Sequence, residues 1–453
     1  MTQAQSEQRA GSATKEYRFG PRLVTGPAAV VASAPAAEPD SLTTSQSLIR
    51  IQALMDAEGY VVSTAEVANF FLAMTVSPLV ILSGISGTGK SLLPRKFAQR
   101  TQSIFHSIPV QPQWSDNSDL FGYVPTLTPE KYIKGALVDG LLAANEDPSK
   151  LVIALLDEMN LAPVEHYFSD FLSITETRFR NADRKVVSDP LPIELPIEVP
   201  DDDNAIVSKL RGLRLPPNLR VIGTANMDET THSFSPKVLD RAFTIEFDDP
   251  DLTSFASGSA AGDDTFNALA KIVIRETNAI SVLEARPQSQ DIFDHVAQLL
   301  SEVQDILAPA GIKFGYRTRD AILLYLHFWR ELDLADIMTG AAALDFCFLQ
   351  KVLPKVSGSG EVLAEALDKL AAWLEAQSNI ARPAASAEVT ASAEVAASAE
   401  VASSAEVAAS ADTADTGECV EVQFAGNLAR SRQKLARMIE ILKLDGSTRY
   451  WGT

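Results

Sequence analysis

The chain has 453 residues, and its 39 Lys and Arg residues against 59 Asp and Glu residues give a formal net charge of −20. This acidic balance argues against a simple nucleic-acid wrapper, because non-specific DNA affinity comes from Lys and Arg side chains that neutralise phosphates. Two cysteines, Cys347 and Cys419, are too few for a disulfide framework or a cysteine-rich zinc site, and they favour a reducing, cytoplasmic location. No apolar run approaches about 18 residues, so we expect no membrane span.

The first part of the chain is predicted to be a disordered arm. Residues 1–45 are rich in Ala, Ser, Pro and Gly and show no sustained periodicity. Acidic residues in this arm argue against a transit peptide, and the lack of an apolar stretch argues against a secretory signal. Residues 47 to about 75 are predicted to form two helices, which Gly59 separates. The second begins with a capping box at Ser63 or Thr64.

From residue 79 onward, apolar runs alternate with helical segments. The candidate strands are Leu79–Leu82, Ser103–Val110, Leu151–Leu156, Leu219–Thr224 and Ala242–Phe247. Continuous apolar runs of this kind are typical of a parallel sheet that is covered on both faces. We therefore predict an α/β nucleotide-binding domain over residues 46–255. An insert at about residues 176–215 is predicted to form a hairpin with an acidic loop, because apolar residues alternate there and prolines interrupt them.

The remaining sequence is predominantly helical. Amphipathic segments predict a separate helical lid domain over residues 256–380. Residues 381–418 hold an acidic Ala/Ser/Glu/Val repeat with a period of six residues. This period does not match a helix, and the repeat cannot bury enough apolar surface to fold, so we expect a solvated linker. Residues 419–453 are predicted to contain a helix that docks back on the lid.

The strongest chemical signal is the segment GISGTGKS, which fits the phosphate-binding pattern G-x4-G-K-[S/T], known as Walker A. The residues expected to bind the nucleotide here are Gly84, Ser86, Gly87, Thr88, Gly89, Lys90 and Ser91. Glycines let backbone N–H groups cradle phosphates, Lys90 would reach the β- and γ-phosphates, and the Ser91 hydroxyl would bind Mg²⁺. A Gly-rich turn with an incidental lysine, or a site that has lost hydrolysis, is disfavoured because the motif follows a predicted strand and opens a helix.

Two acids follow the apolar run LVIALL, as a Walker B strand requires. Asp157 at the strand end would hold Mg²⁺ through water, and Glu158 would activate the attacking water. Acids at strand ends are also common surface residues. Their position about 67 residues after Lys90 favours the catalytic interpretation.

Three more polar positions are candidates for the same site. Asn226 ends the strand LRVIGTAN and would orient the water near the γ-phosphate, unless it only leads a turn. Arg241 would act as an arginine finger in the site of a neighbouring subunit, unless it pairs with Asp240 or another local carboxylate. Arg317 or Arg319 opens a lid helix, and one of them would reach the phosphates in the same subunit; a purely structural role is the alternative for both.

Together these segments resemble AAA+ ATPases of the McrB-like group, the motors of McrBC-type restriction systems. The resemblance rests on ILSGISGTGKS, VQPQWSDNSDLFGY, LLDEMNLAPVEHYFSDFLS, LRVIGTANMDETTHSFSPKVLDRAFTIEF and FGYRTRDAI. It implies a P-loop AAA+ core with a parallel sheet flanked by helices, followed by an α-helical lid. It also implies that Asp157 and Glu158 form Walker B, that Asn226 is sensor I, that Arg241 is the finger and that Arg317 is sensor II.

The resemblance further implies Mg²⁺, ATP or GTP, and a homo-oligomeric ring, usually a hexamer, with nucleotide between subunits. The base-reading motif NKxD of GTP-binding proteins does not occur, so we expect ATP. Restriction motors carry a separate N-terminal DNA-reading domain, which we do not find here. We therefore expect DNA to be engaged indirectly or through the pore, with cleavage by a separate McrC-like nuclease. Two alternatives stay open: a MoxR-like ATPase that remodels or matures proteins, and a nucleotide-switched scaffold with incidental turnover.

Overall fold

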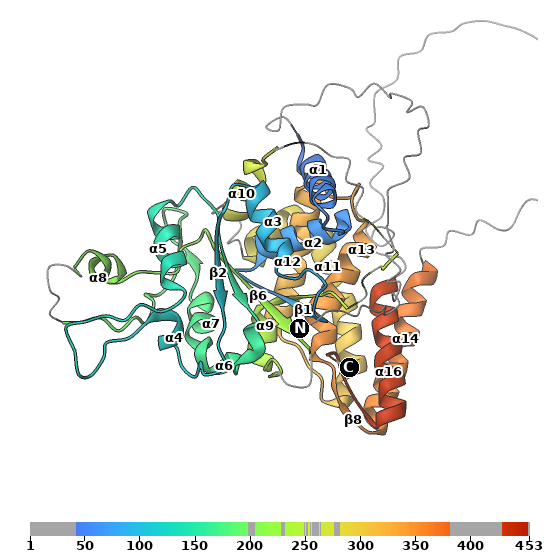
Figure 1. Ribbon diagram of the computed structural model, residues 1–453. Helices are drawn as coiled ribbons and strands as arrows, with labels where there is room; N and C mark the ends of the chain where they lie inside the picture. The colour runs from blue at the N-terminus through green and yellow to red at the C-terminus, as the bar shows by residue number, and fades with distance from the viewer. Residues whose placement is uncertain are drawn as a thin grey trace, which may run out of the picture. The chain divides into compact units, whose positions relative to one another are not determined.

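The computed structural model describes residues 42–197, 204–227, 232–248, 250, 252–253, 255, 262, 264–275, 281–380 and 428–451. The expected arm up to residue 41 and the expected linker from residue 381 lie outside the described residues. Figure 1 shows the strands with helices on both sides of the sheet. No helix within the described ranges is both long enough and apolar enough to cross a membrane.

All five predicted strands are confirmed, and they form one parallel sheet in the order β2-β3-β6-β1-β7. The strands are β1 (Leu79–Gly84), β2 (Ile104–Pro109), β3 (Val152–Asp157), β6 (Leu219–Asn226) and β7 (Phe243–Glu246). In register, Gly84 lies opposite Asn226, and Leu156 lies opposite Gly223. The carboxyl ends of the first, third and sixth strands therefore meet at one edge of the sheet.

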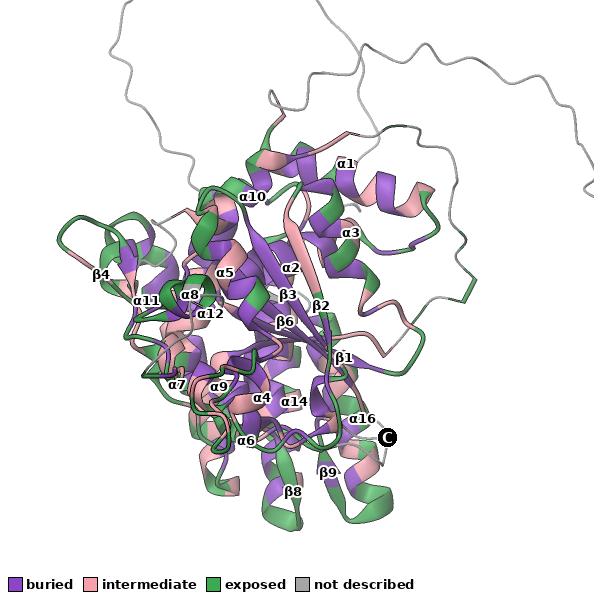
Figure 2. Ribbon diagram, turned by 60° about the vertical axis from the view of Figure 1, so that its left-hand side comes forward, coloured by how far each residue is buried: buried purple, intermediate pink, exposed green. Residues whose placement is uncertain are grey.

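The central strands are mostly apolar because both faces of the sheet are buried, as Figure 2 shows for β1, β3 and β6. Along β1, Val80 and Leu82 belong to one hydrophobic cluster, whereas Leu79 and Ile81 belong to the other. This alternation follows from the two-residue period of a strand. The helices of this part are α1 (Thr44–Ala57), α2 (Thr64–Val76), α3 (Leu92–Arg100), α4 (Ser118–Phe121), α5 (Val138–Glu146), α6 (Val164–Tyr167), α7 (Ser169–Glu176) and α9 (Pro236–Arg241).

Each of the first two helices begins with a capping box. The capping box of α2 is formed by Ser63 and Glu66, each side chain bonding to the other residue's backbone N–H. Thr43 and Gln46 form a second box at the start of α1, which the sequence analysis did not single out. Each box satisfies backbone donors that the first helical turn leaves unpaired. Gly59, with φ of +89°, lies in the turn between the two helices.

The C-terminal helices share a core with the sheet. They are α10 (Asn267–Ile274), α11 (Val282–Leu307), α12 (Tyr316–Glu331), α13 (Gly340–Cys347) and α14 (Glu361–Ile380). Their buried side chains form one continuous cluster with α1, α2 and one face of β1. Tyr325 stacks on Phe243 with ring centroids 5.8 Å apart, and its hydroxyl donates to Asn69 Oδ1 at 2.8 Å. The lid helices thus have no separate core of their own among the described residues.

Two further parts complete the described chain. In the predicted insert, β4 (Phe179–Arg180) and β5 (Val186–Val187) pair in antiparallel fashion, and α8 (Asn204–Leu210) follows. Helix α16 (Ala429–Asp445) packs against α14, as Figure 1 shows. After it, β9 (Ser447–Arg449) pairs with β8 (Ser357–Ser359). This pairing joins segments on either side of the linker, and local sequence patterns do not predict it.

Candidate active site

The phosphate-binding loop connects β1 to α3, and neighbouring atoms leave no room for a side chain at two of its glycines. Gly84 has φ of +138°, and a Cβ there would lie 2.5 Å from the carbonyl oxygen of Phe247 and 2.7 Å from Asp248 Oδ1. Gly89 has φ of +83°, and a Cβ there would lie 2.5 Å from the ring of Tyr60. A larger residue at either position would displace the loop, because real Cβ atoms do not approach neighbours this closely. The loop therefore keeps its backbone exposed toward a ligand.

The side chain of Lys90 lies inside this loop. It is buried, and its ammonium donates to the carbonyl oxygens of Gly84, at 3.0 Å, and Ile85, at 2.6 Å. Burial lowers the pKa of Lys90, while the carboxylates of Asp248, Asp157 and Glu158 oppose this shift. Phosphate oxygens could replace the carbonyl oxygens as acceptors without moving the ammonium out of the loop.

Ser91 and Asp157 lie side by side across the loop and β3. The Ser91 hydroxyl donates to Asp157 Oδ1 at 2.7 Å. Hydroxyl and carboxylate oxygens are the ligands that Mg²⁺ prefers, so this pair fits the metal that a P-loop site requires. The structure shows no cluster of three His, Cys, Asp or Glu side chains that could hold a metal within the described ranges. Phosphate and water would therefore have to supply the other ligands of a magnesium ion.

Thr224 connects the two acids of the Walker B segment. Its hydroxyl donates to Asp157 Oδ1 at 2.7 Å and accepts from the backbone N–H of Glu158 at 2.9 Å. Glu158 has φ of +56°, a left-handed conformation that is uncommon for a residue other than glycine. The Asn226 side chain donates to Glu158 Oε1 at 3.2 Å. Hydrogen bonds thus link Ser91, Asp157, Thr224, Glu158 and Asn226 at one sheet edge.

Two residues of this network were not predicted from the sequence. Thr224 is a polar residue in an apolar strand and stands two positions before Asn226, so both side chains share one face of β6. That pattern could have identified it. Asn160 donates to the backbone carbonyl of Asn226 at 2.8 Å and accepts from the N–H of His232 at 2.9 Å. No local pattern marks Asn160, because its partners lie far away in the sequence.

Arg241 and Arg317 lie together, away from this network. Both pair with Glu176 at the end of α7, Arg317 at a distance of 2.7 Å. The carbonyl oxygen of Arg241 accepts from Ser77, which precedes β1, so this arginine lies at the amino edge of the sheet. The local carboxylate of Arg241 is thus Glu176, whereas Asp240 pairs with Lys355.

Arg319, the other lid candidate, also has a local partner. Its guanidinium pairs with Asp320 at 2.7 Å and lies over the ring of Tyr316, 4.7 Å from the centroid. The ion pairs and hydrogen bonds described for Arg317 and Arg319 do not include a residue of the Walker segments. The predicted contact of Arg317 with phosphate in its own subunit therefore requires the arginine to leave Glu176.

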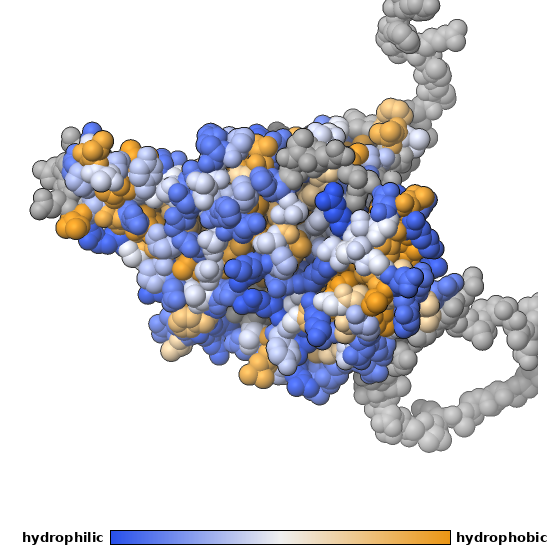
Figure 3. Space-filling view, turned by 90° about the horizontal axis from the view of Figure 1, so that it is seen from below, coloured by the Kyte–Doolittle hydropathy of each residue, from blue (hydrophilic) through white to orange (hydrophobic). Residues whose placement is uncertain are grey.

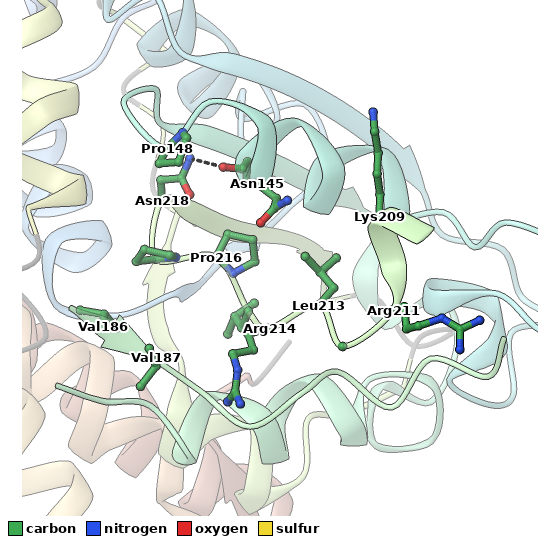
Figure 4. Close-up of a pocket in the computed structure, with 14 residues that line it drawn as sticks. Asn145, Pro148, Val186, Val187, Lys209, Arg211, Leu213, Arg214, Pro216 and Asn218 are labelled. Atoms are coloured by element: carbon green, nitrogen blue, oxygen red, sulfur yellow. Dashed lines mark hydrogen bonds between the residues drawn. The ribbon is translucent and has the colours of Figure 1, made fainter. Parts of the chain in front are cut away.

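Two cavities lie at opposite edges of the sheet. One, of about 630 Å³, borders the phosphate-binding loop at Thr88 and is lined by Tyr60, by residues 244–248 and by α16. The other, of about 370 Å³, is shown in Figure 4 and lies at the start of β6. There Asn218 donates to the carbonyl oxygen of Ala144 at 3.0 Å. The first cavity adjoins the phosphate-binding loop, and the second does not.

Two family models match parts of the chain. Residues 79–242 match a family model described as an AAA domain of the dynein-related subfamily. Residues 273–447 match a model described as a domain of unknown function, DUF8727. A similar solved structure is the crystal structure of a putative ATPase from Cytophaga hutchinsonii, with 14% identity, a TM-score of 0.37, and coverage of 63% of this chain and 82% of that chain. No curated protein has a significant sequence match to the chain.

The matched AAA segment spans the elements that build the site. It begins at the first residue of β1 and ends just after Arg241, so it contains the phosphate-binding loop, both Walker B acids and Asn226. Its parallel sheet and flanking helices are those predicted for an AAA+ core. Residues 79–242 therefore match an AAA domain of the dynein-related subfamily, and the chain has the α/β fold of AAA+ ATPases.

Proposed function

We propose that this protein is a Mg²⁺-dependent nucleoside triphosphatase that uses ATP. The observation that carries the proposal is the hydrogen-bonded network at the carboxyl edge of the sheet, where Ser91 contacts Asp157 and Asn226 contacts Glu158. A hydroxyl and carboxylate pair beside a phosphate-binding loop is suited to Mg²⁺, and a carboxylate held by an amide is suited to a general base.

Each residue would have a separate task. Backbone N–H groups of the loop and the Lys90 ammonium would bind the β- and γ-phosphates, and Ser91 with Asp157 would hold Mg²⁺, which neutralises phosphate charge when bound. The Glu158 carboxylate would accept a proton from the attacking water. Asn226 donates to that carboxylate and would orient it, and Thr224 fixes the backbone of Glu158. Positioning and electrostatics would supply the catalysis.

We further propose that the protein works as a ring and belongs with McrB-like motors. The position of Arg241 supports a ring, because this arginine lies at the amino edge of the sheet, beside Ser77, and far from its own phosphate-binding loop. An arginine finger there would serve a neighbouring subunit. The resemblance of the segments around Walker B and Asn226 supports a role beside a separate McrC-like nuclease in DNA restriction.

A MoxR-like role in remodelling or maturing proteins is the second candidate. The match to the dynein-related AAA model supports it as well as it supports an McrB-like role. The acidic net charge of −20 also suits a protein client at least as well as DNA. Stimulation of turnover by a purified nuclease partner with DNA would favour restriction, and stimulation by a protein client without DNA would favour remodelling.

The proposed activity is tested by turnover and binding measured together. Wild-type protein should hydrolyse ATP or GTP in the presence of Mg²⁺. Glu158→Gln should abolish hydrolysis and retain nucleotide binding, whereas Lys90→Ala should lose binding, because it removes the phosphate ligand. Glu375→Gln, an exposed carboxylate of α14, is the matched control and should behave as wild type. Assembled wild-type protein that hydrolyses neither nucleotide, with DNA or protein stimulants present, would contradict the proposal.

A further inference from the structure

Helix α16 comes after the expected linker and is docked at three points, two on the helical lid and one on the α/β domain. At its start, the backbone N–H groups of Arg430 and Ser431 donate to the Asp345 carboxylate, each at 2.9 Å. In its middle, Lys434 pairs with Glu246 at the end of β7. Beyond its end, β9 pairs with β8. These contacts hold one face of α16 against the cavity that opens beside the phosphate-binding loop.

Lys434 is the centre of this contact. Its side chain is only 12% exposed and contacts Glu246, which is 14% exposed. The same ammonium lies 3.9 Å from Asp248 Oδ2 and 4.5 Å from the ring centroid of Tyr450. One lysine thus faces two carboxylates that come from the strand next to β1. Buried carboxylates of like charge repel each other strongly unless a cation lies between them.

Asp248 connects Lys434 to the phosphate-binding loop. Its Oδ1 accepts a hydrogen bond from the backbone N–H of Ile85 at 3.1 Å, while Oδ2 faces Lys434. The same Oδ1 would lie 2.7 Å from a Cβ at Gly84, so this carboxylate is pressed against the first residue of the loop. The path from α16 to the loop therefore contains a single side chain, and a shift of Asp248 moves a backbone group of the loop directly.

We propose that Lys434 is a positioning residue for the phosphate-binding loop, so that helix α16, on the far side of the linker, completes the nucleotide site. This inference rests on the proposed function. Burial and the neighbouring Asp248 already raise the pKa of Glu246 to about 7, and Lys434 opposes this shift. Without the ammonium, Asp248 shares a proton with Glu246 in place of the hydrogen bond from the N–H of Ile85, and the charge that is no longer offset disfavours a triphosphate nearby. Both effects weaken nucleotide binding more than they slow the chemical step.

The same face of α16 supplies more of the cavity lining. Arg430, Gln433 and Arg437 border the cavity that reaches Thr88. The guanidinium of Arg430 lies over the ring of Phe346, 4.2 Å from its centroid, which fixes the start of the helix. An ion pair that only stabilised the fold would not need an acid in contact with the loop. The link through Asp248 is what distinguishes Lys434 from such a pair.

The test is Lys434→Met in the full-length chain, read by titration of a fluorescent ATP analogue and of ADP, together with steady-state hydrolysis. We expect affinity to fall about tenfold or more, because the variant leaves buried charges uncompensated. The kcat at saturating ATP should change far less, which separates loop positioning from loss of catalytic residues. Lys434→Arg should restore most of the affinity. Lys443→Met, an exposed lysine on the same helix, is the matched control and should bind as wild type.

A double variant tests the path through Asp248. In the Lys434→Met background, Asp248→Asn removes the uncompensated charge beside the loop and keeps an oxygen that accepts from Ile85, so affinity should partly recover. Unchanged affinity in Lys434→Met would overturn the proposal, even if the melting temperature fell. Absence of recovery in the double variant would overturn the path through Asp248. If Lys434→Met does not fold, the proposal is tested with Lys434→Arg instead. A Lys434→Arg variant that folds normally but lacks most of the wild-type nucleotide affinity would also contradict the proposal. Wild-type protein that binds no nucleotide would instead refute the proposed function itself.

Discussion

At the scale of single residues, Thr224 joins the two Walker B acids through one hydroxyl. It donates to Asp157 and accepts from the N–H of Glu158, which stabilises the left-handed backbone at Glu158. A residue that holds the proposed metal ligand and the proposed general base in this way would affect activity without contacting substrate. Loss of such a supporting hydrogen bond typically costs about 10- to 100-fold in activity or metal affinity.

We therefore predict that Thr224→Val, which keeps the shape and removes the hydroxyl, lowers kcat by about 10- to 100-fold. Nucleotide affinity in the absence of Mg²⁺ should change little, because the phosphate-binding loop is untouched. Steady-state hydrolysis across a Mg²⁺ titration measures both effects. Thr224→Ser retains the hydroxyl and should retain most of the activity. Equal turnover in Thr224→Val and wild type would show that the two acids need no such support.

At the scale of elements, the start of α16 depends on a residue from another helix. Leu428 occupies the N-cap position and offers no side-chain acceptor, so Asp345 from α13 accepts the N–H groups of Arg430 and Ser431 instead. Burial raises the pKa of Asp345, while the hydrogen bonds from the start of α16 oppose this shift. The Asp345 carboxylate of α13 thus caps α16, although the expected linker separates the two helices in the sequence.

Asp345→Ala should lower the free energy of unfolding by about 1–2 kcal/mol, the usual cost of removing a helix cap. Chemical denaturation followed by circular dichroism measures it. Asp345→Asn keeps an oxygen acceptor and should lose less. Asp336→Ala serves as the control, because Asp336 is an exposed aspartate that precedes α13, the helix of Asp345. If Asp345→Ala were as stable as wild type, α16 would not depend on this cap.

The contrast between the strands and α16 shows what the sequence can predict. Apolar runs predict the central strands β1, β3 and β6, because burial on both faces of the sheet leaves a local signature. Strand order then brings Ser91, Asp157, Glu158 and Asn226 to one edge, as their positions at strand ends suggest. The contacts of Lys434 with Glu246 and the pairing of β8 with β9 join segments far apart in the sequence. Such pairs have no periodicity, so the sequence predicts the docked helix but not what it contacts.

At the scale of the whole molecule, exposed apolar side chains are spread over several elements of the described chain. Large exposed examples are Leu127, Phe179, Leu283, Tyr316 and Leu444. Figure 3 shows one face, on which small apolar groups lie among hydrophilic side chains. Scattered exposure of this kind is normal for a protein surface and does not by itself identify an interface. The proposed assembly is better tested through Arg241, which would have to act in the nucleotide site of a second subunit.

Arg241 lies about 20 Å along the strand direction from the phosphate-binding loop, estimated from the rise per residue between Ser77 and Gly84. This distance exceeds the reach of an arginine side chain, so Arg241 cannot serve its own site. Glu176 also pairs with Arg317, so this carboxylate keeps a cation when Arg241 turns to a phosphate of a neighbouring subunit. Arg241→Ala should thus bind ATP normally and hydrolyse it slowly.

Mixing two inactive variants then distinguishes a finger that acts between subunits from a structural arginine. Arg241→Ala keeps Glu158, and Glu158→Gln keeps Arg241, so random mixing at equal amounts makes about a quarter of the interfaces competent. We expect turnover to recover on mixing, measured as ATP hydrolysis after ADP-driven subunit exchange. Glu158→Gln mixed with the double variant Arg241→Ala/Glu158→Gln has no competent interface and should stay inactive. Light scattering would show whether mixed assemblies form. If they form and turnover does not recover, Arg241 is not the finger, because Glu158 of one subunit and Arg241 of its neighbour would then meet at shared interfaces without effect.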